Sequence, residues 1–187
     1  MESGRTNLKS HLESILFDQS QIRARVAEMG EQITRDFEGE PLTIVAVLQG
    51  GALFMADLIR EIHLPLEIDS ISVASYHGGT ESSGTVQFHQ TKMPELDGRN
   101  VLILDDILDS GRTLSAIRRR LETDCSPKSV RSVVLLSKAI SRATPIEADY
   151  VGFTVGNEFV VGYGLDYEGR YRNLPMIGVL QSEYISS

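Results

Sequence analysis

Cysteine is almost absent from this sequence, because Cys125 is the only one among 187 residues. A single cysteine cannot form a disulfide within the chain, so the sequence lacks the framework of small secreted proteins and fits a reducing compartment. It also offers no cysteine-based zinc site, and the four histidines lack the helical spacing of metal-binding pairs. We therefore expect a cytoplasmic protein.

Long apolar runs and an excess of basic residues are missing as well. The longest apolar run, at residues 42–48, is too short to cross a bilayer, and the first residues do not resemble a secretory signal. Lys and Arg number 18 against 26 Asp and Glu, which gives a net charge of −8. Because binding to nucleic acid or anionic membranes needs clustered basic residues, we expect neither as a partner.

The composition itself is that of an ordinary globular protein, with 41% hydrophobic and 24% charged residues. A chain of this size and composition can bury one core, so we expect a single domain over residues 1–187. Apolar residues recur every three or four positions from Ile22 to Phe37, which predicts a helix. Asp18 and Gln21 form its expected capping box, and Gly39 marks its end.

Strand and helix patterns alternate along the rest of the chain. Strands are predicted at 42–48, 70–75, 85–91, 101–104, 129–137, 149–155, 159–164 and 176–180, and helices at 52–62 and 113–122. This alternation predicts an α/β fold in which helices flank both faces of a mostly parallel central sheet. Ligands of such sheets bind at the carboxyl ends of the strands.

The most specific chemistry lies in VLILDDILDSGRTL at residues 101–114. Just beyond the expected strand come Asp105, Asp106, Asp109, Ser110, Gly111 and Thr113. A glycine-containing turn that opens a helix binds phosphate through its backbone amides, and hydroxyl groups add further donors. Carboxylates repel phosphate, so they must face hydrogen-bond donors or a cation, such as a ribose diol or magnesium. The alternative is an ordinary helix start with capping acids, which the combined string disfavours.

This string resembles the phosphoribosyl-pyrophosphate signature of type I phosphoribosyltransferases. From about Ile15 to Leu180 the chain resembles the hypoxanthine-guanine phosphoribosyltransferase family, through VAVLQGG, the loop SY-x-GGT-x-SSG, the signature, and FVVGYGLDYEGRYRNLP. The resemblance implies a type I phosphoribosyltransferase fold with a small C-terminal hood. It also implies a purine salvage enzyme that transfers the phosphoribosyl group from phosphoribosyl pyrophosphate to N9 of a 6-oxopurine, hypoxanthine or guanine, giving IMP or GMP. Mg²⁺ would be its cofactor, and a homodimer or homotetramer its assembly.

The resemblance assigns a role to each part of the sugar-phosphate site. Asp105 and Asp106 would bind the ribose hydroxyls, and Asp109 would be catalytic, accepting a proton near the purine N7. The phosphoribosyl pyrophosphate site would comprise Gln49, Gly50, Gly51, Asp105, Asp106, Asp109, Ser110, Gly111, Arg112, Thr113 and Arg172. The family usually has lysine at the position of Gln49, so this chain lacks that charge.

The resemblance likewise assigns the purine, the metal and a lid. Lys138, Phe159, Val160 and Asp166 would bind the purine; Asp105, Asp106 and Asp166 would contact magnesium; Ser75 and Tyr76 would close as a lid. By pattern alone, Lys138 is a solvated strand end, and Phe159 and Val160 are core residues. The role of Arg142 stays open, because the preceding residues depart from the family's proline-containing pattern, and the choice among purines is open too.

Two other functions use the same features. One is a nucleotide-sensing regulatory protein that binds RNA, and the other is a nucleotide-binding module without activity. The acidic net charge disfavours the first, and the complete set of acids disfavours the second.

Overall fold

The structure is a computed structural model that describes residues 7–75, 86–89 and 93–185. Its main sheet has the strand order β4-β3-β2-β5-β6-β7. The strands are β2 (Leu42–Leu48), β3 (Leu66–Ser75), β4 (Val86–Phe88), β5 (Asn100–Leu108), β6 (Ser129–Lys138) and β7 (Tyr150–Val155). β4 pairs antiparallel with β3, whereas the other neighbours pair in parallel. The predicted α/β fold with a mostly parallel sheet is confirmed.

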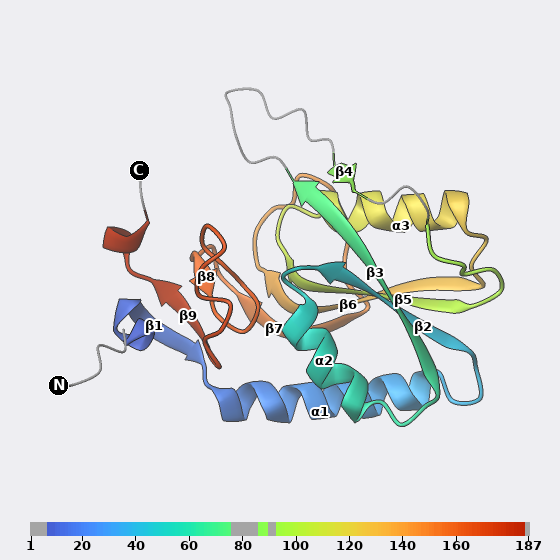
Figure 1. Cartoon of the computed structure of the whole chain (residues 1–187), viewed down its shortest axis with the longest axis horizontal. Coiled ribbons are helices and arrows are strands. Elements are labelled where there is room, and N and C mark those ends of the chain that lie inside the picture. The colour runs from blue at the N-terminus through green and yellow to red at the C-terminus, as the bar shows by residue number, and fades with distance from the viewer. Residues whose placement is uncertain (1–6, 76–85, 90–92, 186–187) are drawn as a thin grey trace.

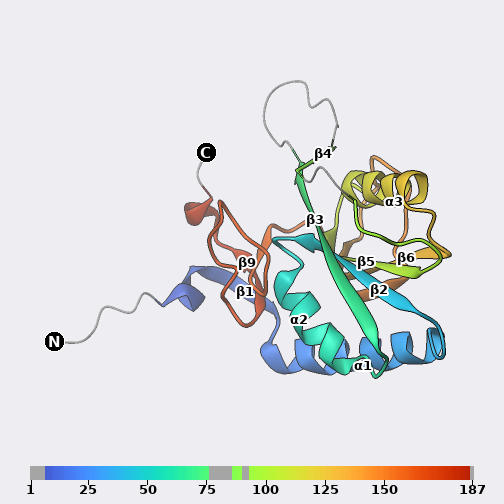
Figure 2. The same ribbon diagram turned by 45° about the vertical axis from the view of Figure 1, so that its right-hand side comes forward.

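Helices cover both faces of this sheet (Figures 1 and 2). α1 (Gln19–Asp36) and α2 (Ala52–Glu61) lie on one face, and α3 (Arg112–Asp124) lies on the other. The capping box of α1 is present, because the Asp18 carboxylate accepts from the backbone amide of Gln21 at 2.9 Å and the Gln21 side chain accepts from the Asp18 amide at 2.9 Å. Within the described residues, no helix is both long and apolar enough to span a bilayer.

A second, three-stranded antiparallel sheet stands beside the first, at the left of Figure 1, and we call it the hood. It contains β1 (Leu12–Phe17), β8 (Val160–Val161) and β9 (Ile177–Leu180), with short 3₁₀ helices at Leu8–His11 and Ser182–Tyr184. The hood has a small apolar core of its own: Leu12, Val161, Tyr171, Leu174 and Leu180. β1 was not predicted from the sequence. It lies near the start of the described chain, whereas β8 and β9 lie near its end, so the hood is built from both ends.

β5 corrects the predicted end of the strand at residue 104. It continues to Leu108, because Asp105 and Ile107 still pair with β6, at Val134 and Leu136. Asp105 and Asp106 therefore lie inside the strand, and only residues 109–111 lie between it and α3. The predicted strand at 159–164 is shorter, and β8 keeps only two of its residues.

Candidate active site

A cavity of about 310 Å³ opens where β2 and β5 end and α3 begins. Its walls come from the loop after β2, the end of β5, the start of α3 and the hood. The sequence-predicted residues that line it are Gly50, Asp105, Asp106, Asp109, Ser110, Gly111, Thr113, Asp166 and Arg172. The fold thus brings these residues from three stretches of the chain, at 50, 105–113 and 166–172, to one cavity at the carboxyl edge of the sheet.

Asp105 and Asp106 give this cavity its electrostatic character. Asp105 is 7% exposed, and burial together with the charge of Asp106 raises its pKa well above the ordinary value. Burial also raises the pKa of Asp106, although hydrogen bonds and the nearby Arg172 guanidinium oppose the rise. The carboxylates of buried Asp105 and half-buried Asp106 are adjacent and repel each other when both are charged, so a cation or a pair of hydroxyl donors would relieve the repulsion.

The loop after β2 lies directly against these carboxylates. A Cβ atom at Gly50 would come within 1.8 Å of Asp106 Oδ2, so no larger residue fits there without displacement. The Gly51 amide donates to the Val47 carbonyl at 3.1 Å, and this hydrogen bond closes the turn into α2. Of the predicted loop residues, Gly50 lines the cavity, whereas Gln49 is exposed and, like Gly51, stands outside the lining.

The phosphate-binding turn predicted at residues 110–113 is held from outside by the segment after β6. The Thr144 amide donates to the Ser110 carbonyl at 3.1 Å. Gly111 has φ +78°, and a Cβ there would lie 2.4 Å from the Thr144 carbonyl oxygen. Glycine is therefore required both for the left-handed conformation and for the close approach. The turn opens α3, where free amides favour an anion, while the Arg112 side chain points to solvent.

Lys138 and Asp109 form an ion pair, with 3.0 Å between Nζ and Oδ2. The Lys138 side chain is 12% exposed, so it is not the solvated strand end that its pattern suggested. Arg142 braces this strand end by donating to the Ser137 hydroxyl at 2.7 Å and to the Lys138 carbonyl at 3.3 Å. The arrangement gives Arg142, whose role the sequence left open, a structural contact with the residue before Lys138 and with Lys138 itself.

The hood contributes one acidic side chain, Asp166, and one basic side chain, Arg172, to the cavity. Arg172 Nη2 lies 2.8 Å from Asp166 Oδ1, and Arg172 Nη1 donates to the Gly164 carbonyl at 2.5 Å. The Gly169 amide donates to the other Asp166 oxygen at 2.7 Å. These contacts fix both side chains at the edge of the hood, and they leave part of the planar Arg172 guanidinium for an anionic ligand.

Phe159 and Val160 differ in their exposure to solvent. Val160 is 6% exposed and pairs with Val179 of β9, as a core residue would. Phe159 is 44% exposed, with Tyr167 edge-on to its ring at a centroid distance of 5.6 Å, so the core interpretation is wrong for Phe159. Neither side chain lines the 310 Å³ cavity. Of the expected lid, Ser75 ends β3, and Tyr76 lies outside the described residues.

Sequence reasoning missed Thr144 and Tyr167. Thr144 carries no recognisable chemistry, and it reaches Ser110 only because the chain turns back after β6, so no local pattern could have found it. Tyr167 lies inside the quoted segment FVVGYGLDYEGRYRNLP, and an aromatic residue close to Phe159 was a usable signal.

Comparison with known proteins agrees with this geometry. Residues 14–168 match the family described as "Phosphoribosyl transferase domain". The chain belongs to the phosphoribosyltransferase family. Within it, the chain is 44% identical to a hypoxanthine-guanine phosphoribosyltransferase of Staphylococcus aureus strain Mu50, over 96% of this chain and 100% of that protein. It thus belongs to the hypoxanthine-guanine phosphoribosyltransferases, as its sequence motifs predicted.

A solved structure and a longer relative extend the comparison. The crystal structure of a hypoxanthine phosphoribosyltransferase from Staphylococcus aureus superimposes with a TM-score of 0.92 at 43% identity, covering 99% of this chain and 100% of that one. A bifunctional TilS/HprT protein of Listeria innocua is 44% identical over 98% of this chain, which spans 28% of that protein's length. These relatives give no support to the RNA-binding regulatory alternative.

Proposed function

We propose that this chain transfers the phosphoribosyl group of phosphoribosyl pyrophosphate to N9 of a 6-oxopurine, hypoxanthine or guanine, as a purine salvage enzyme. The observation that carries the proposal is the composition of the 310 Å³ cavity. Two adjacent carboxylates, a turn that can bind an anion and an arginine face one space, and phosphoribosyl pyrophosphate presents a diol, a monophosphate and a pyrophosphate. Membership of the hypoxanthine-guanine phosphoribosyltransferases supports it independently.

The sugar phosphate would bind along the end of β5. Asp105 and Asp106 accept hydrogen bonds from the two ribose hydroxyls, which relieves the repulsion between their buried charges. The 5′-phosphate lies on the amides of residues 110–113 at the start of α3, with hydroxyl donors from Ser110 and Thr113. Pyrophosphate would lie between the loop at Gly50 and the Arg172 guanidinium.

The base would approach from the side of Lys138. The Lys138 ammonium group would donate to the 6-oxo oxygen of the purine. The Phe159 ring would stack on the purine ring, and the Val160 backbone would lie at the edge of the purine. As the bond from N9 to C1′ forms, the bond from C1′ to the pyrophosphate oxygen breaks and its electron pair leaves with pyrophosphate. The N7 proton passes to Asp109. Lys138 fixes the Asp109 carboxylate through their 3.0 Å ion pair.

The residues of this site fit a magnesium ion that is held by the protein and the substrate together. Within the described residues, no group of three or more His, Cys, Asp or Glu side chains is arranged to hold a metal. Mg²⁺ characteristically takes one or two carboxylates together with water and substrate phosphates, and Asp105, Asp106 and Asp166 line the same cavity as oxygen donors. We propose that these residues hold Mg²⁺ with the substrate, and that the ion offsets pyrophosphate charge.

The test is a product assay. Hypoxanthine, guanine and xanthine are each offered with phosphoribosyl pyrophosphate, and nucleoside monophosphate and pyrophosphate are quantified with Mg²⁺ and after removal of the metal with EDTA. We expect IMP or GMP together with an equal amount of pyrophosphate, and loss of turnover with EDTA. If no purine gives a product, the proposed activity is wrong. If turnover persists after removal of the metal, only the proposed role of magnesium is wrong.

Location and assembly are further proposals. The one cysteine, Cys125, is buried and has no second cysteine to pair with in the chain, which suits a cytoplasmic protein. We propose a homodimer or homotetramer in solution, as the sequence resemblance implies. Light scattering on a size-exclusion column would measure the mass, and a monomer at working concentration would contradict the proposal.

A further inference from the structure

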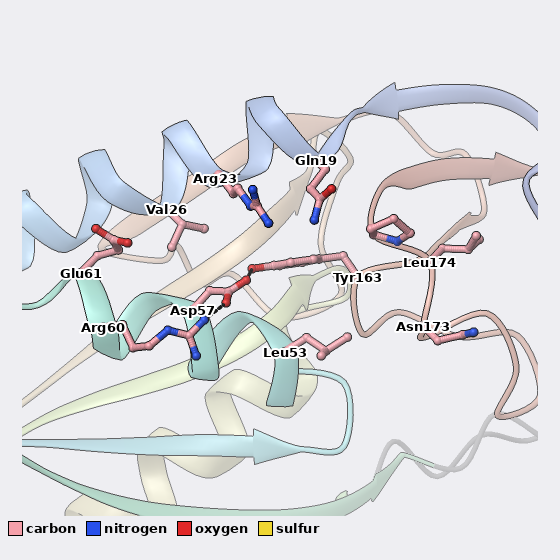
Figure 3. Close-up of a pocket in the computed structure, with 11 residues that line it drawn as sticks. Gln19, Arg23, Val26, Leu53, Asp57, Arg60, Glu61, Tyr163, Asn173 and Leu174 are labelled. Carbon is pink, nitrogen blue, oxygen red and sulfur yellow. Dashed lines mark hydrogen bonds and ion pairs between the residues drawn. The ribbon is translucent and has the colours of Figure 1, made fainter.

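A part-buried hydrogen bond joins the hood to the helices that cover the main sheet. The Tyr163 hydroxyl donates to Asp57 Oδ2 of α2 at 2.5 Å, and Tyr163 is 8% exposed. Figure 3 shows the Tyr163 ring entering from the hood and lying between α1 and α2, with its hydroxyl directed at Asp57. Asp57 also forms an ion pair with Arg60, one turn further along α2. The Asp57 carboxylate therefore has two partners, the Tyr163 hydroxyl and the Arg60 guanidinium.

The backbone next to Tyr163 leads straight to the candidate active site. The Tyr163 amide donates to the Leu174 carbonyl at 2.8 Å, and the Gly164 amide donates to the Arg172 carbonyl at 3.0 Å. The Gly164 carbonyl in turn accepts from Arg172 Nη1 at 2.5 Å. Because Gly164 follows Tyr163 directly, a displacement of Tyr163 moves the acceptor that orients the Arg172 guanidinium.

Gly164 also rests on the loop that closes the other side of the cavity. A Cβ atom at Gly164 would lie 2.3 Å from the Gly50 carbonyl oxygen, and Gly50 itself lies against Asp106. At this point the hood and the loop after β2 are in backbone contact, with Gly164 against Gly50. A small shift of the hood changes the distance between Arg172 and the carboxylates of β5.

Tyr163 packs against the main apolar core and also borders a cavity of about 680 Å³ between α1, α2 and the hood (Figure 3). The backbone at Tyr163 has φ +48°, a conformation that is unfavourable for a tyrosine and persists only where its surroundings hold it. Burial and the Asp57 carboxylate both raise the pKa of Tyr163, so its hydroxyl remains protonated, and a donor, at neutral pH.

We propose that Tyr163 and Asp57 are positioning residues for the pyrophosphate site. Their hydrogen bond holds the hood loop in the place where Gly164 orients Arg172 and where Arg172 meets the pyrophosphate of the substrate. The inference rests on the proposed function, because its effect is measured in that reaction. Neither side chain touches the substrate, so the pair acts only through the loop.

The experiment compares two buried tyrosines whose hydroxyls each donate to an aspartate; the Tyr150 hydroxyl also accepts from Arg131. Tyr150 is 4% exposed and donates to Asp36 Oδ2 at 2.7 Å, at the far end of α1. Both Tyr163→Phe and Tyr150→Phe lose a hydroxyl bound to an aspartate, and both should lower the melting temperature. We expect Tyr163→Phe alone to raise the KM for phosphoribosyl pyrophosphate and the inhibition constant of pyrophosphate by about tenfold, the factor that about 1.4 kcal/mol gives. The KM for the purine should stay within about twofold, since the lost energy lies in the pyrophosphate contacts.

Two variants of Asp57 test the same hydrogen bond from its acceptor side, one that keeps the acceptor and one that removes it. Asp57→Asn keeps a side-chain oxygen that accepts from Tyr163, so it should recover most of the affinity for phosphoribosyl pyrophosphate. Asp57→Leu removes the acceptor and should match Tyr163→Phe, and the double variant should be no worse than either, because both remove one interaction. If Tyr163→Phe does not fold, the comparison of Asp57→Asn with Asp57→Leu carries the same test.

The outcomes separate this inference from the proposed function. If the wild-type protein makes no nucleotide, the proposed function fails, and calorimetric titration with magnesium pyrophosphate becomes the readout for the pair. If the wild-type protein is active but Tyr163→Phe keeps the wild-type KM for phosphoribosyl pyrophosphate while its melting temperature falls, the pair is purely structural. Equal changes of KM in Tyr163→Phe and Tyr150→Phe would overturn the inference in the same way.

Discussion

Replacing Gly111 with alanine should damage both the stability and the sugar-phosphate site. Gly111 lies at φ +78°, and its missing Cβ would lie 2.4 Å from the Thr144 carbonyl oxygen and 2.8 Å from Ile146 Cγ2. The first fact makes the backbone conformation unfavourable for any L-residue. The second forces either the turn at 110–113 or the segment at 144–146 to move, because the contacted oxygen belongs to the backbone.

The magnitude follows from adding these two effects. A non-glycine residue in the left-handed region costs roughly 1–2 kcal/mol, and forcing a methyl group into a filled space costs roughly 1–3 kcal/mol more. Gly111→Ala should therefore lower the free energy of unfolding by about 2–5 kcal/mol. For a protein of this size that corresponds to a melting temperature lower by about 4–20 °C.

The chain offers a matched control in Gly39. Gly39 has φ +77°, nearly the value of Gly111, but no atom lies within 4 Å of the position that a Cβ would take there. Gly39→Ala should thus lose only the conformational part, about 1–2 kcal/mol. Denaturant unfolding measures both free energies, and steady-state kinetics measure the KM for phosphoribosyl pyrophosphate, which should rise in Gly111→Ala and stay unchanged in Gly39→Ala. Equal losses of stability in the two variants, with an unchanged KM in both, would refute the reasoning about this turn.

Two further substitutions test the carboxylates. Asp109→Asn should lower kcat by about 10² to 10⁴, the usual contribution of a general base, and leave substrate binding mostly intact; wild-type turnover would remove Asp109 from the reaction. Because the pKa of Asp106 is raised in the folded protein, the folded state holds this proton more tightly than the unfolded state. The resulting contribution to stability is fully present below the ordinary pKa of 3.8, and it is lost as the pH rises through the folded-state pKa. Asp106→Asn should therefore melt higher than the wild type at pH 7, with the difference vanishing near pH 3, while it loses affinity for phosphoribosyl pyrophosphate. A melting temperature at pH 7 at or below that of the wild type would contradict this account of the buried pair.

The sequence predicted those parts of the fold that depend on local signals. The capping box at Asp18 and Gln21 and the apolar periodicity after it define α1 almost to the residue. The apolar run at 42–48 coincides with β2, because a strand buried on both faces is apolar along nearly its whole length. The segment from 105 to 113 was predicted as a site because its carboxylates, hydroxyls and glycine follow one another in the chain, and most of its residues line the 310 Å³ cavity.

The parts that were missed depend on distant residues. β1 shows no alternation, and its partner β9 lies at the other end of the described chain, so only the fold reveals the hood sheet. The end of β5 was placed too early because Asp105 and Asp106 look like the start of a loop, whereas pairing with β6 continues past them. The contact between Tyr163 and Asp57 joins two ordinary residues 106 positions apart, which no spacing pattern can indicate.

The central claim is that one activated sugar phosphate binds at the carboxyl end of β5. A crystal structure of the protein with IMP or GMP bound measures this directly. We predict the ribose hydroxyls within hydrogen-bonding distance of Asp105 or Asp106 and the 5′-phosphate on the amides of residues 110–113. A nucleotide bound in the cavity between α1 and α2, or one whose phosphate lies away from residues 110–113, would contradict the claim.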